Sequence, residues 1–296
     1  MKGLTVEISM GAGNQVFVRK TYLNHAFISG NKLYKLKYNI QEAKNQNKTT
    51  LLTFGGAFSN HIAAVAAVGK EYGFHTIGVI RGEELQDKIG ENPTLSFAKE
   101  QGMQFHFVSR EVFRNKTTDY FIEDLKKEFG DFYLIPEGGT NALAVKGCKE
   151  ILEEGDQVYD YICCPVGTGG TISGIIKASF SHQKILGFPA LKGDFLQEEI
   201  SKFTTKKNWE LVTDYHFGGY AKVNAELIAF INQFKKQNNI PLDPVYTGKM
   251  LFGIRDLMTK GFFPKHSKIL VIHTGGLQGI QGMNTVLKKK NLPLIQ

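Results

Sequence analysis

The chain has 296 residues, of which 42% are hydrophobic, and it carries a formal net charge of +8 at pH 7. This length suits two average domains or one large one. No apolar run approaches the ~18 residues of a membrane span, no Cys-x-x-Cys pair suggests a zinc site, and no basic segment with interleaved aromatic residues resembles a nucleic-acid motif.

The start of the chain lacks the apolar stretch of a signal peptide. Cys163 and Cys164 are adjacent in an apolar run, which indicates small core residues and not a disulfide framework. We therefore expect a reduced, cytoplasmic protein that binds no metal, no nucleic acid and no membrane.

Strand-like and helix-like segments alternate along the chain. A Ser-Gly turn precedes Lys32, where a helical pattern begins. Runs rich in β-branched and aromatic residues predict strands at 50–56, 75–82, 104–109, 132–139, 158–167, 184–190 and 268–276. Amphipathic runs predict helices at 59–73, 92–102, 119–130, 170–180, 224–238 and 248–261. This alternation predicts an α/β protein with parallel sheets, in two domains with a cleft between them.

Ser59 or Asn60 is expected to cap the helix at 59–73, and Gly73 to end it. Four predicted strands end in glycine-rich turns, at 54–60, 136–141, 165–174 and 273–279. Ligands of open α/β sheets bind at the carboxyl ends of the strands, so we expect these turns to line one pocket.

The turn at 165–174 is the most specific of the four, because it leaves a strand and enters a helix. Its candidate ligand-binding residues are Gly167, Thr168, Gly169, Gly170 and Thr171. A dinucleotide fingerprint would need glycine where Ile172 stands, and the lysine of a Walker loop is absent. The loop therefore favours a single phosphate at a helix N-terminus, although a glycine-rich tight turn with no ligand would have the same sequence.

A loop that binds a single phosphate would explain why a lysine, Lys32, stands directly after a tight turn. Pyridoxal 5'-phosphate requires one phosphate site and one lysine that reacts with its aldehyde. The alternative is a solvated lysine at the start of a helix.

Five motifs occur in a fixed order along the chain. They are SGNKLYKLKY (29–38), GGAFSNH (55–61), VGTGGT (166–171), LDPVYTGK (242–249) and HTGG (273–276). Together they resemble the family of 1-aminocyclopropane-1-carboxylate (ACC) deaminases and D-cysteine desulfhydrases, which belong to the tryptophan-synthase-β-like, fold type II pyridoxal-phosphate enzymes. The resemblance extends from about residue 18 to residue 280.

This resemblance implies roles for the cofactor-binding residues. Lys32 would form the Schiff base, whereas Lys35 and Lys37 would be structural or solvated. Asn60 would bond the phenolic oxygen of the cofactor, and Thr274 would face its pyridine nitrogen. The phosphate would be held by Gly167, Thr168, Gly169, Gly170 and Thr171.

The resemblance also implies a catalytic group of Lys32, Ser59, Tyr220 and Tyr246. Ser59 would receive the substrate carboxylate together with the N–H groups of Asn60 and His61, Tyr246 would lie beside the pyridine ring, and Tyr220 would lie near the substrate. Several simpler roles stay open. Ser59 could be only a helix cap, Tyr246 an ordinary packed aromatic residue, and His273 a core histidine. His61 is expected to contribute its N–H and not its imidazole.

Two positions separate the branches of the family. ACC deaminases resemble one another in having Glu and Leu where this chain has Thr247 and Thr274, so the chain resembles the D-cysteine desulfhydrases more closely. A hydroxyl beside the pyridine nitrogen would give a weaker electron sink than a carboxylate. The segment VRKTYLNH (18–25) and Tyr34 depart from the family pattern and leave the substrate open.

The resemblance implies a two-domain, three-layer fold with open twisted sheets, a small domain at 36–139 and a large domain formed by 1–35 and 140–296. The expected activity is a lyase or hydrolase reaction that converts D-cysteine to pyruvate, sulfide and ammonia by α,β-elimination. The alternatives are ACC deamination, a related amino-acid dehydratase or racemase, and a non-catalytic ligand-binding protein on the same scaffold. The family also implies a homodimer.

Overall fold

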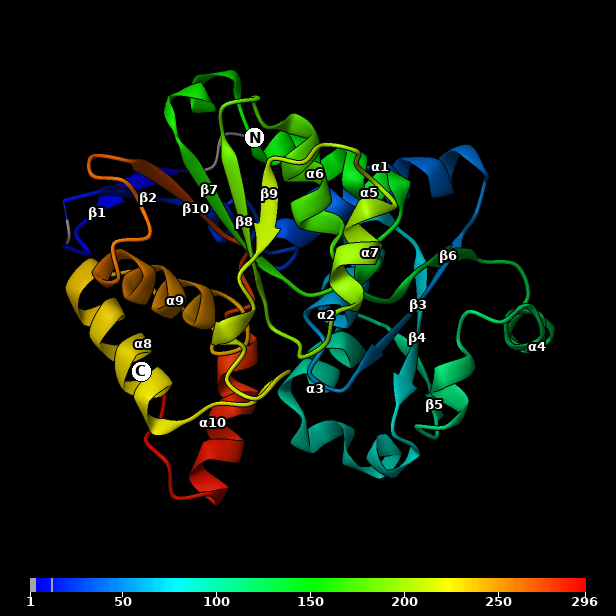
Figure 1. Cartoon of the computed structure of the whole chain (residues 1–296). Coiled ribbons are helices and arrows are strands. Elements are labelled where there is room, and N and C mark those ends of the chain that lie inside the picture. The colour runs from blue at the N-terminus through cyan, green and yellow to red at the C-terminus, as the bar shows by residue number, and fades with distance from the viewer. Residues whose placement is uncertain (1–3, 12) are drawn as a thin grey trace.

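Ten strands form two sheets in the computed structural model, which describes residues 4–11 and 13–296 (Figure 1). The six-stranded sheet has the order β1 (Thr5–Ile8), β2 (Gln15–Lys20), β10 (Lys268–His273), β7 (Tyr161–Val166), β8 (Lys184–Pro189) and β9 (Trp209–Leu211). The four-stranded sheet has the order β5 (Gln104–Val108), β4 (His75–Arg81), β3 (Thr50–Gly56) and β6 (Tyr133–Ile135). All the pairs are parallel except β1 with β2, which confirms the predicted parallel sheets.

The α-helices are α1 (Asn31–Asn45), α2 (Asn60–Tyr72), α3 (Pro93–Glu100), α4 (Asp119–Phe129), α5 (Ala142–Cys148), α6 (Gly170–Ala178), α7 (Phe195–Ser201), α8 (Ala225–Asn238), α9 (Thr247–Thr259) and α10 (Gly279–Lys289). The predicted helices and strands all occur, with ends that differ by a few residues. The sequence pattern did not predict β1, β2, β9, α5, α7 or α10.

Alternate residues of β7 pack on opposite faces of the six-stranded sheet, because the side chains of a strand alternate. Ile162 and Cys164 belong to a core shared with α6, whereas Cys163 belongs to a core shared with α8 and α9. Both cysteines are fully buried, as predicted. Helices therefore cover both faces of this sheet and give the three-layer arrangement.

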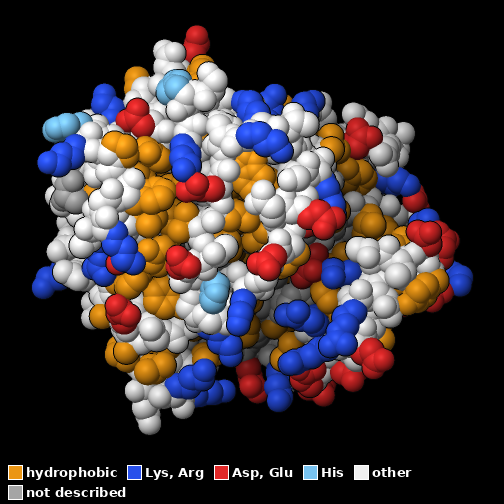
Figure 2. Space-filling view, in the orientation of Figure 1, with side chains coloured by type: hydrophobic (Ala, Val, Ile, Leu, Met, Phe, Trp, Pro, Cys, Tyr) orange, Lys and Arg blue, Asp and Glu red, His pale blue; other side chains and the backbone are white. Residues whose placement is uncertain are grey.

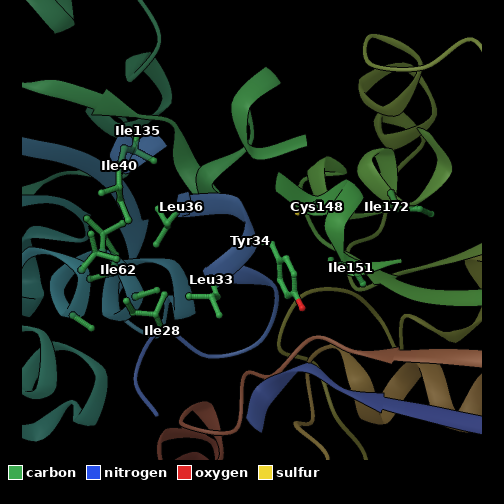
Figure 3. Packing of buried hydrophobic residues seen from close by; sticks show 14 of the residues in the cluster. Ile28, Leu33, Tyr34, Leu36, Ile40, Ile62, Ile135, Cys148, Ile151 and Ile172 are labelled. Atoms are coloured by element: carbon green, nitrogen blue, oxygen red, sulfur yellow. The ribbon is translucent and has the colours of Figure 1, made fainter. Parts of the chain in front are cut away.

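Helix α1 lies between the two sheets (Figure 3). Leu33 and Leu36 point toward Ile62 of α2, while Tyr34 points the other way, toward Ile151. All of these side chains are buried in one hydrophobic cluster, and burying a large apolar side chain stabilises a fold by roughly 1.5–3 kcal/mol. The helix that begins beside Lys32 is thus fixed by the core on two sides.

The predicted limits of helix α2 are confirmed by its capping geometry. The Ser59 hydroxyl oxygen accepts hydrogen bonds from the N–H groups of His61 and Ile62, and Gly73 ends the helix in the left-handed conformation.

The domain limits stay a prediction. Helix α1 crosses the proposed limit between residues 35 and 36, and residues 1–3 and 12 of the proposed large domain lie outside the described residues. On the face shown in Figure 2, charged side chains of both signs are interspersed with apolar ones. A membrane span would need a longer and more apolar helix than any that the described residues form.

Candidate active site

A pocket of about 630 Å³ lies where the glycine-rich turns of both sheets meet. Its lining includes every residue proposed for the site except Gly170, namely Lys32, Ser59, Asn60, His61, Gly167, Thr168, Gly169, Thr171, Tyr220, Tyr246 and Thr274. A second hollow of about 790 Å³, between α3 and α10, contains none of these residues. The pocket at the glycine turns is therefore the candidate active site.

The turn before Lys32 packs directly on the turn after β10. Gly30 has a φ of +63°, and a Cβ atom on it would lie 1.9 Å from the carbonyl oxygen of Thr274. The same carbonyl accepts a hydrogen bond from the N–H of Asn31 at 3.2 Å. Only glycine allows this approach, so the tight turn fixes Lys32 against the 273–276 segment.

The side chain of Asn31 ties this turn to the phosphate loop. Its amide donates a 2.8 Å hydrogen bond to the hydroxyl of Thr171 in the first turn of α6. Its carbonyl oxygen lies 3.4 Å from the ammonium of Lys32. Burial, and after it the nearby charge of Lys35, lowers the pKa of Lys32 to about 7. A substantial fraction of Lys32 is thus available as a neutral amine near pH 7.

Lys35 is buried and lines the pocket, so it is not solvated, while the structural role that was the other expectation stays open. Its ammonium donates hydrogen bonds to the carbonyl of Gly138 at 2.8 Å, to the hydroxyl of Thr140 at 2.9 Å and to the hydroxyl of Thr168 at 3.3 Å. Burial lowers its pKa to about 8. Lys37, by contrast, forms a surface pair with Glu150, as expected.

The 167–171 loop has the backbone expected of an anion cradle. Gly169 has a φ of +82° and comes immediately before α6, whose first residue is Gly170. A Cβ atom on Gly170 would lie 2.7 Å from Thr140 Oγ1 and 3.3 Å from the Lys35 ammonium. The helix N-terminus and the ammonium of Lys35 therefore meet at this loop, and both favour a bound phosphate.

Helix α2 begins at the pocket with Ser59, Asn60 and His61. The N–H of His61 donates to Ser59 Oγ at 3.2 Å, so it already has a partner, while the Ser59 O–H can still donate to a bound anion. Asn60 Oδ1 is buried and, within the described part of the chain, has no hydrogen-bond partner. Such an atom requires an explanation, and a polar ligand in the pocket would supply its partner. This unpaired amide, the glycine cradle and Lys35 fit a ligand with one phosphate and a polar ring.

The imidazole of His61 is held in one tautomer. The hydroxyl of Thr53 lies 2.8 Å from the carbonyl of Ile135, which can only accept, and 2.8 Å from His61 Nε2. The Thr53 proton therefore goes to Ile135, and Nε2–H must donate to Thr53. Burial holds the pKa of His61 well below its usual value, with further lowering by Lys32 and Lys35. The buried Nδ1 is thus an unprotonated acceptor, and no partner for it occurs among residues 4–11 and 13–296.

Two tyrosines close another side of the pocket. The rings of Tyr220 and Tyr246 meet edge to face with centroids 6.2 Å apart. Tyr246 also lies against the phosphate loop, because a Cβ atom on Gly167 would be 3.2 Å from its ring. Burial, and after it the neighbouring Tyr220, raises the pKa of Tyr246 well above its usual value. The structure thus brings both predicted tyrosines to the loop and the pocket.

Thr247 does not line the pocket, contrary to the expectation that its hydroxyl would matter to the pyridine ring. It is fully buried, and its hydroxyl donates a 2.6 Å hydrogen bond to the carboxylate of Asp243. The same carboxylate accepts the N–H groups of Val245, Tyr246 and Thr247. Asp243 therefore fixes the backbone at the start of α9, including that of Tyr246, and Thr247 holds the Asp243 carboxylate in place.

His273 is a satisfied core histidine, one of the roles that the sequence left open. Its Nδ1 accepts the N–H of Gly275 at 3.2 Å, so its Nε2–H donates to the carbonyl of Pro241 at 2.8 Å. These bonds hold the 273–276 turn on which Gly30 packs.

Comparison with known proteins gives concordant results. A family model described as pyridoxal-phosphate dependent enzyme matches residues 6–275. A putative ACC deaminase from Pyrococcus horikoshii is 30% identical over 295 residues, which cover 92% of this chain and 87% of that protein. The bifunctional mitochondrial D-cysteine desulfhydrase/ACC deaminase of Arabidopsis thaliana is 29% identical, with 90% of this chain and 74% of that protein covered. The crystal structure of an ACC deaminase homologue superimposes with a TM-score of 0.84 at 27% identity, covering 98% of this chain and 94% of that one.

Proposed function

The chain belongs to the family of pyridoxal-phosphate dependent enzymes, and from this premise we propose that it catalyses the α,β-elimination of a small amino acid, with D-cysteine as the substrate. The observation that carries the proposal is the single pocket in which Lys32, the anion cradle at 167–171 and the N-terminus of α2 face one another. The expectation of a hydrolase is wrong, because the relatives form a family of lyases and deaminases. The homodimer and the cytoplasmic location stay predictions.

We assign the phosphate of the cofactor to Lys35 and to the loop from Gly167 to Thr171, and its ring to the space beside Asn60, Tyr246 and Thr274. When bound, pyridoxal phosphate supplies an aldehyde that links covalently to an amine and a ring that draws electrons from the carbon beside that amine. The Asn60 amide oxygen, which has no partner among the described residues, supports this assignment, because it belongs to the pocket but not to the 167–171 cradle.

Lys32 would act first as the nucleophile and then as the base. A pKa of about 7 leaves much of its Nζ neutral at physiological pH, as both roles require. After the substrate amine has displaced it, the Nζ of Lys32 would take the proton from the α-carbon. Loss of the β-substituent would then yield a 2-oxo acid and ammonia after hydrolysis.

The substrate carboxylate would bind at the N-terminus of α2. The positive end of the helix favours an anion there, and the Ser59 O–H can donate to it. Arg81 lines the same pocket, and no ion pair with it is found among the described side chains, so its guanidinium could pair with a substrate carboxylate. This arrangement supports an amino acid with a free carboxylate.

The choice of D-cysteine depends on Thr274 alone, since Thr247 lies outside the pocket. A hydroxyl at the pyridine nitrogen would leave it largely neutral, which suits the loss of a good leaving group such as thiolate better than the opening of a cyclopropane ring. The second candidate is ACC deamination, because the Pyrococcus relative is named as a putative ACC deaminase and the plant relative as bifunctional.

Both candidates can be tested with one panel of substrates. Purified enzyme loaded with pyridoxal phosphate is given D-cysteine, L-cysteine and ACC, and 2-oxo acid, sulfide and ammonia are measured. We expect sulfide and pyruvate from D-cysteine, slow turnover of ACC, and no turnover by Lys32→Ala. Efficient turnover of ACC with none of D-cysteine would replace the first candidate by the second. Turnover of neither would contradict both.

A further inference from the structure

The loop before and after Tyr220 has an unusual backbone. Phe217, Gly218, Gly219 and Ala221 all have a positive φ, of 53°, 90°, 116° and 55°. Phe217 and Ala221 are not glycines, so their left-handed backbone is strained. A conformation of this kind persists only where the surrounding structure enforces it.

The enforcing contact comes from Lys249 in helix α9. Its ammonium donates two 2.8 Å hydrogen bonds, one to the carbonyl of His216 and one to the carbonyl of Gly219. The Lys249 side chain is 2% exposed, so the bonds form away from bulk water, where they are stronger. The local bond from the N–H of Gly218 to His216 Nδ1 tightens the same turn.

This contact joins the two tyrosines of the pocket. Gly219 immediately precedes Tyr220, and Lys249 stands three residues after Tyr246 on the helix that Tyr246 caps. We propose that Lys249 is a positioning residue that holds Tyr220 against Tyr246 and the bound substrate. The inference rests on the proposed function, because it assigns Tyr220 to the substrate.

Burial lowers the pKa of Lys249 to about 8, and the charge of Asp243 opposes that shift. A neutral amine keeps two N–H donors but loses the charge that strengthens them. The two hydrogen bonds from Lys249 should therefore weaken gradually above pH 8 but persist.

The test is a double-mutant cycle of Lys249→Met and Tyr220→Phe, measured as kcat and KM on the best substrate of the panel. Each single variant should lower kcat at least tenfold with cofactor affinity unchanged. The double variant should lose no more than Tyr220→Phe does alone. Amide hydrogen exchange at residues 218–220 should quicken in Lys249→Met.

Lys206→Met is the matched control, because the Lys206 ammonium also bonds two carbonyls, those of Lys177 and Ser179, away from the pocket. It should keep the wild-type kcat. If Lys249→Met does not fold, Gly219→Ala strains the same turn from its other side and replaces it in the cycle.

The outcomes distinguish the positioning role of Lys249 from the proposed function. Additive losses in the double variant, or unchanged hydrogen exchange in Lys249→Met, would overturn the positioning role and leave the proposed function intact. A fully active Tyr220→Phe would overturn both the positioning role and the assignment of Tyr220 to the substrate.

Discussion

The ammonium of Lys35 lies 3.3 Å from the hydroxyl of Thr168, so a side chain from helix α1 reaches the loop that precedes α6. Lys32 stands one turn earlier on the same helix. The lysine that would react with the cofactor and the lysine that would bind its phosphate are therefore fixed relative to each other by a single helix.

Replacing Lys35 with Met should weaken the affinity for pyridoxal phosphate about 10- to 100-fold. A hydrogen bond to a charged group contributes about 1.5–3 kcal/mol, and about 1.4 kcal/mol corresponds to a factor of ten. The affinity is measured by titrating the apoprotein with the cofactor and following its absorbance. Lys37→Met, which removes only the surface pair with Glu150, should bind as the wild type does. Equal affinities of the two variants would contradict the assignment.

The reactivity of Lys32 should rise with pH around a midpoint near 7. Burial disfavours the ammonium form, and the neighbouring Lys35 adds to this effect. In the apoprotein, the rate at which an acylating reagent labels Lys32 is followed by peptide mass spectrometry, and Lys35→Met should move the midpoint upward. Labelling with a midpoint above pH 9 would show that the amine is not perturbed.

The lowered pKa of Lys32 also predicts how the contribution of this residue to stability changes with pH. Between about pH 7 and 10.5, the unfolded chain binds more protons at Lys32 than the folded chain does. The contribution of this residue to the free energy of unfolding therefore rises as the pH rises through that window. The free energy of unfolding is measured by urea titration for wild-type apoprotein and for Lys32→Met across this window. The wild-type value minus the variant value should increase as the pH rises.

Thr247→Val should reduce the free energy of unfolding by about 1–2 kcal/mol, because it removes a buried hydrogen bond to Asp243. Thr247→Glu should destabilise the fold more, since it buries a second carboxylate beside the first. Thr259→Val is the control, in the same helix but at an exposed position. If Thr247→Glu is as stable as the wild type, the side chain at 247 must have access to the pocket.

The tautomer of His61 can be observed directly. Nitrogen-15 NMR of histidine-labelled protein should show a protonated Nε2 and an unprotonated Nδ1 at neutral pH, because burial holds the pKa of His61 well below its usual value. His61→Gln identifies the signal by removing it. A protonated Nδ1 would contradict the direction of the Thr53 hydrogen bond.

The sequence was sufficient to predict most of the fold because its strands are apolar and end in glycine. Strands such as β9, with three residues, and β1, with four, are too short to show a period, and α5 contains a glycine in its last turn. Their existence depends on neighbours that are distant in the sequence.

The same limit applies to the site. The motifs located Lys32, Ser59 and the 167–171 loop, since local turns and caps have local signatures. Lys35 has no such signature, because its burial results from Gly138 and Thr140 arriving from another strand end. Its position one helical turn after Lys32 is the signal in the sequence that could have indicated a place in the pocket. The motif does not show that the hydroxyl of Thr247 is bound to Asp243 and that its side chain lies outside the pocket lining.

The pairing of β2 with β10 has a consequence for biosynthesis. Val18 of β2 lies opposite Val271 of β10, whereas the four-stranded sheet is built from one continuous segment between residues 50 and 135. That segment is synthesised early, and domains generally fold as units during synthesis. The turn at Gly30 can settle on Thr274 only after nearly the whole chain has emerged. We therefore expect a nascent chain to form its smaller sheet first and to become able to accept the cofactor only once the turn at 273–276 has been synthesised.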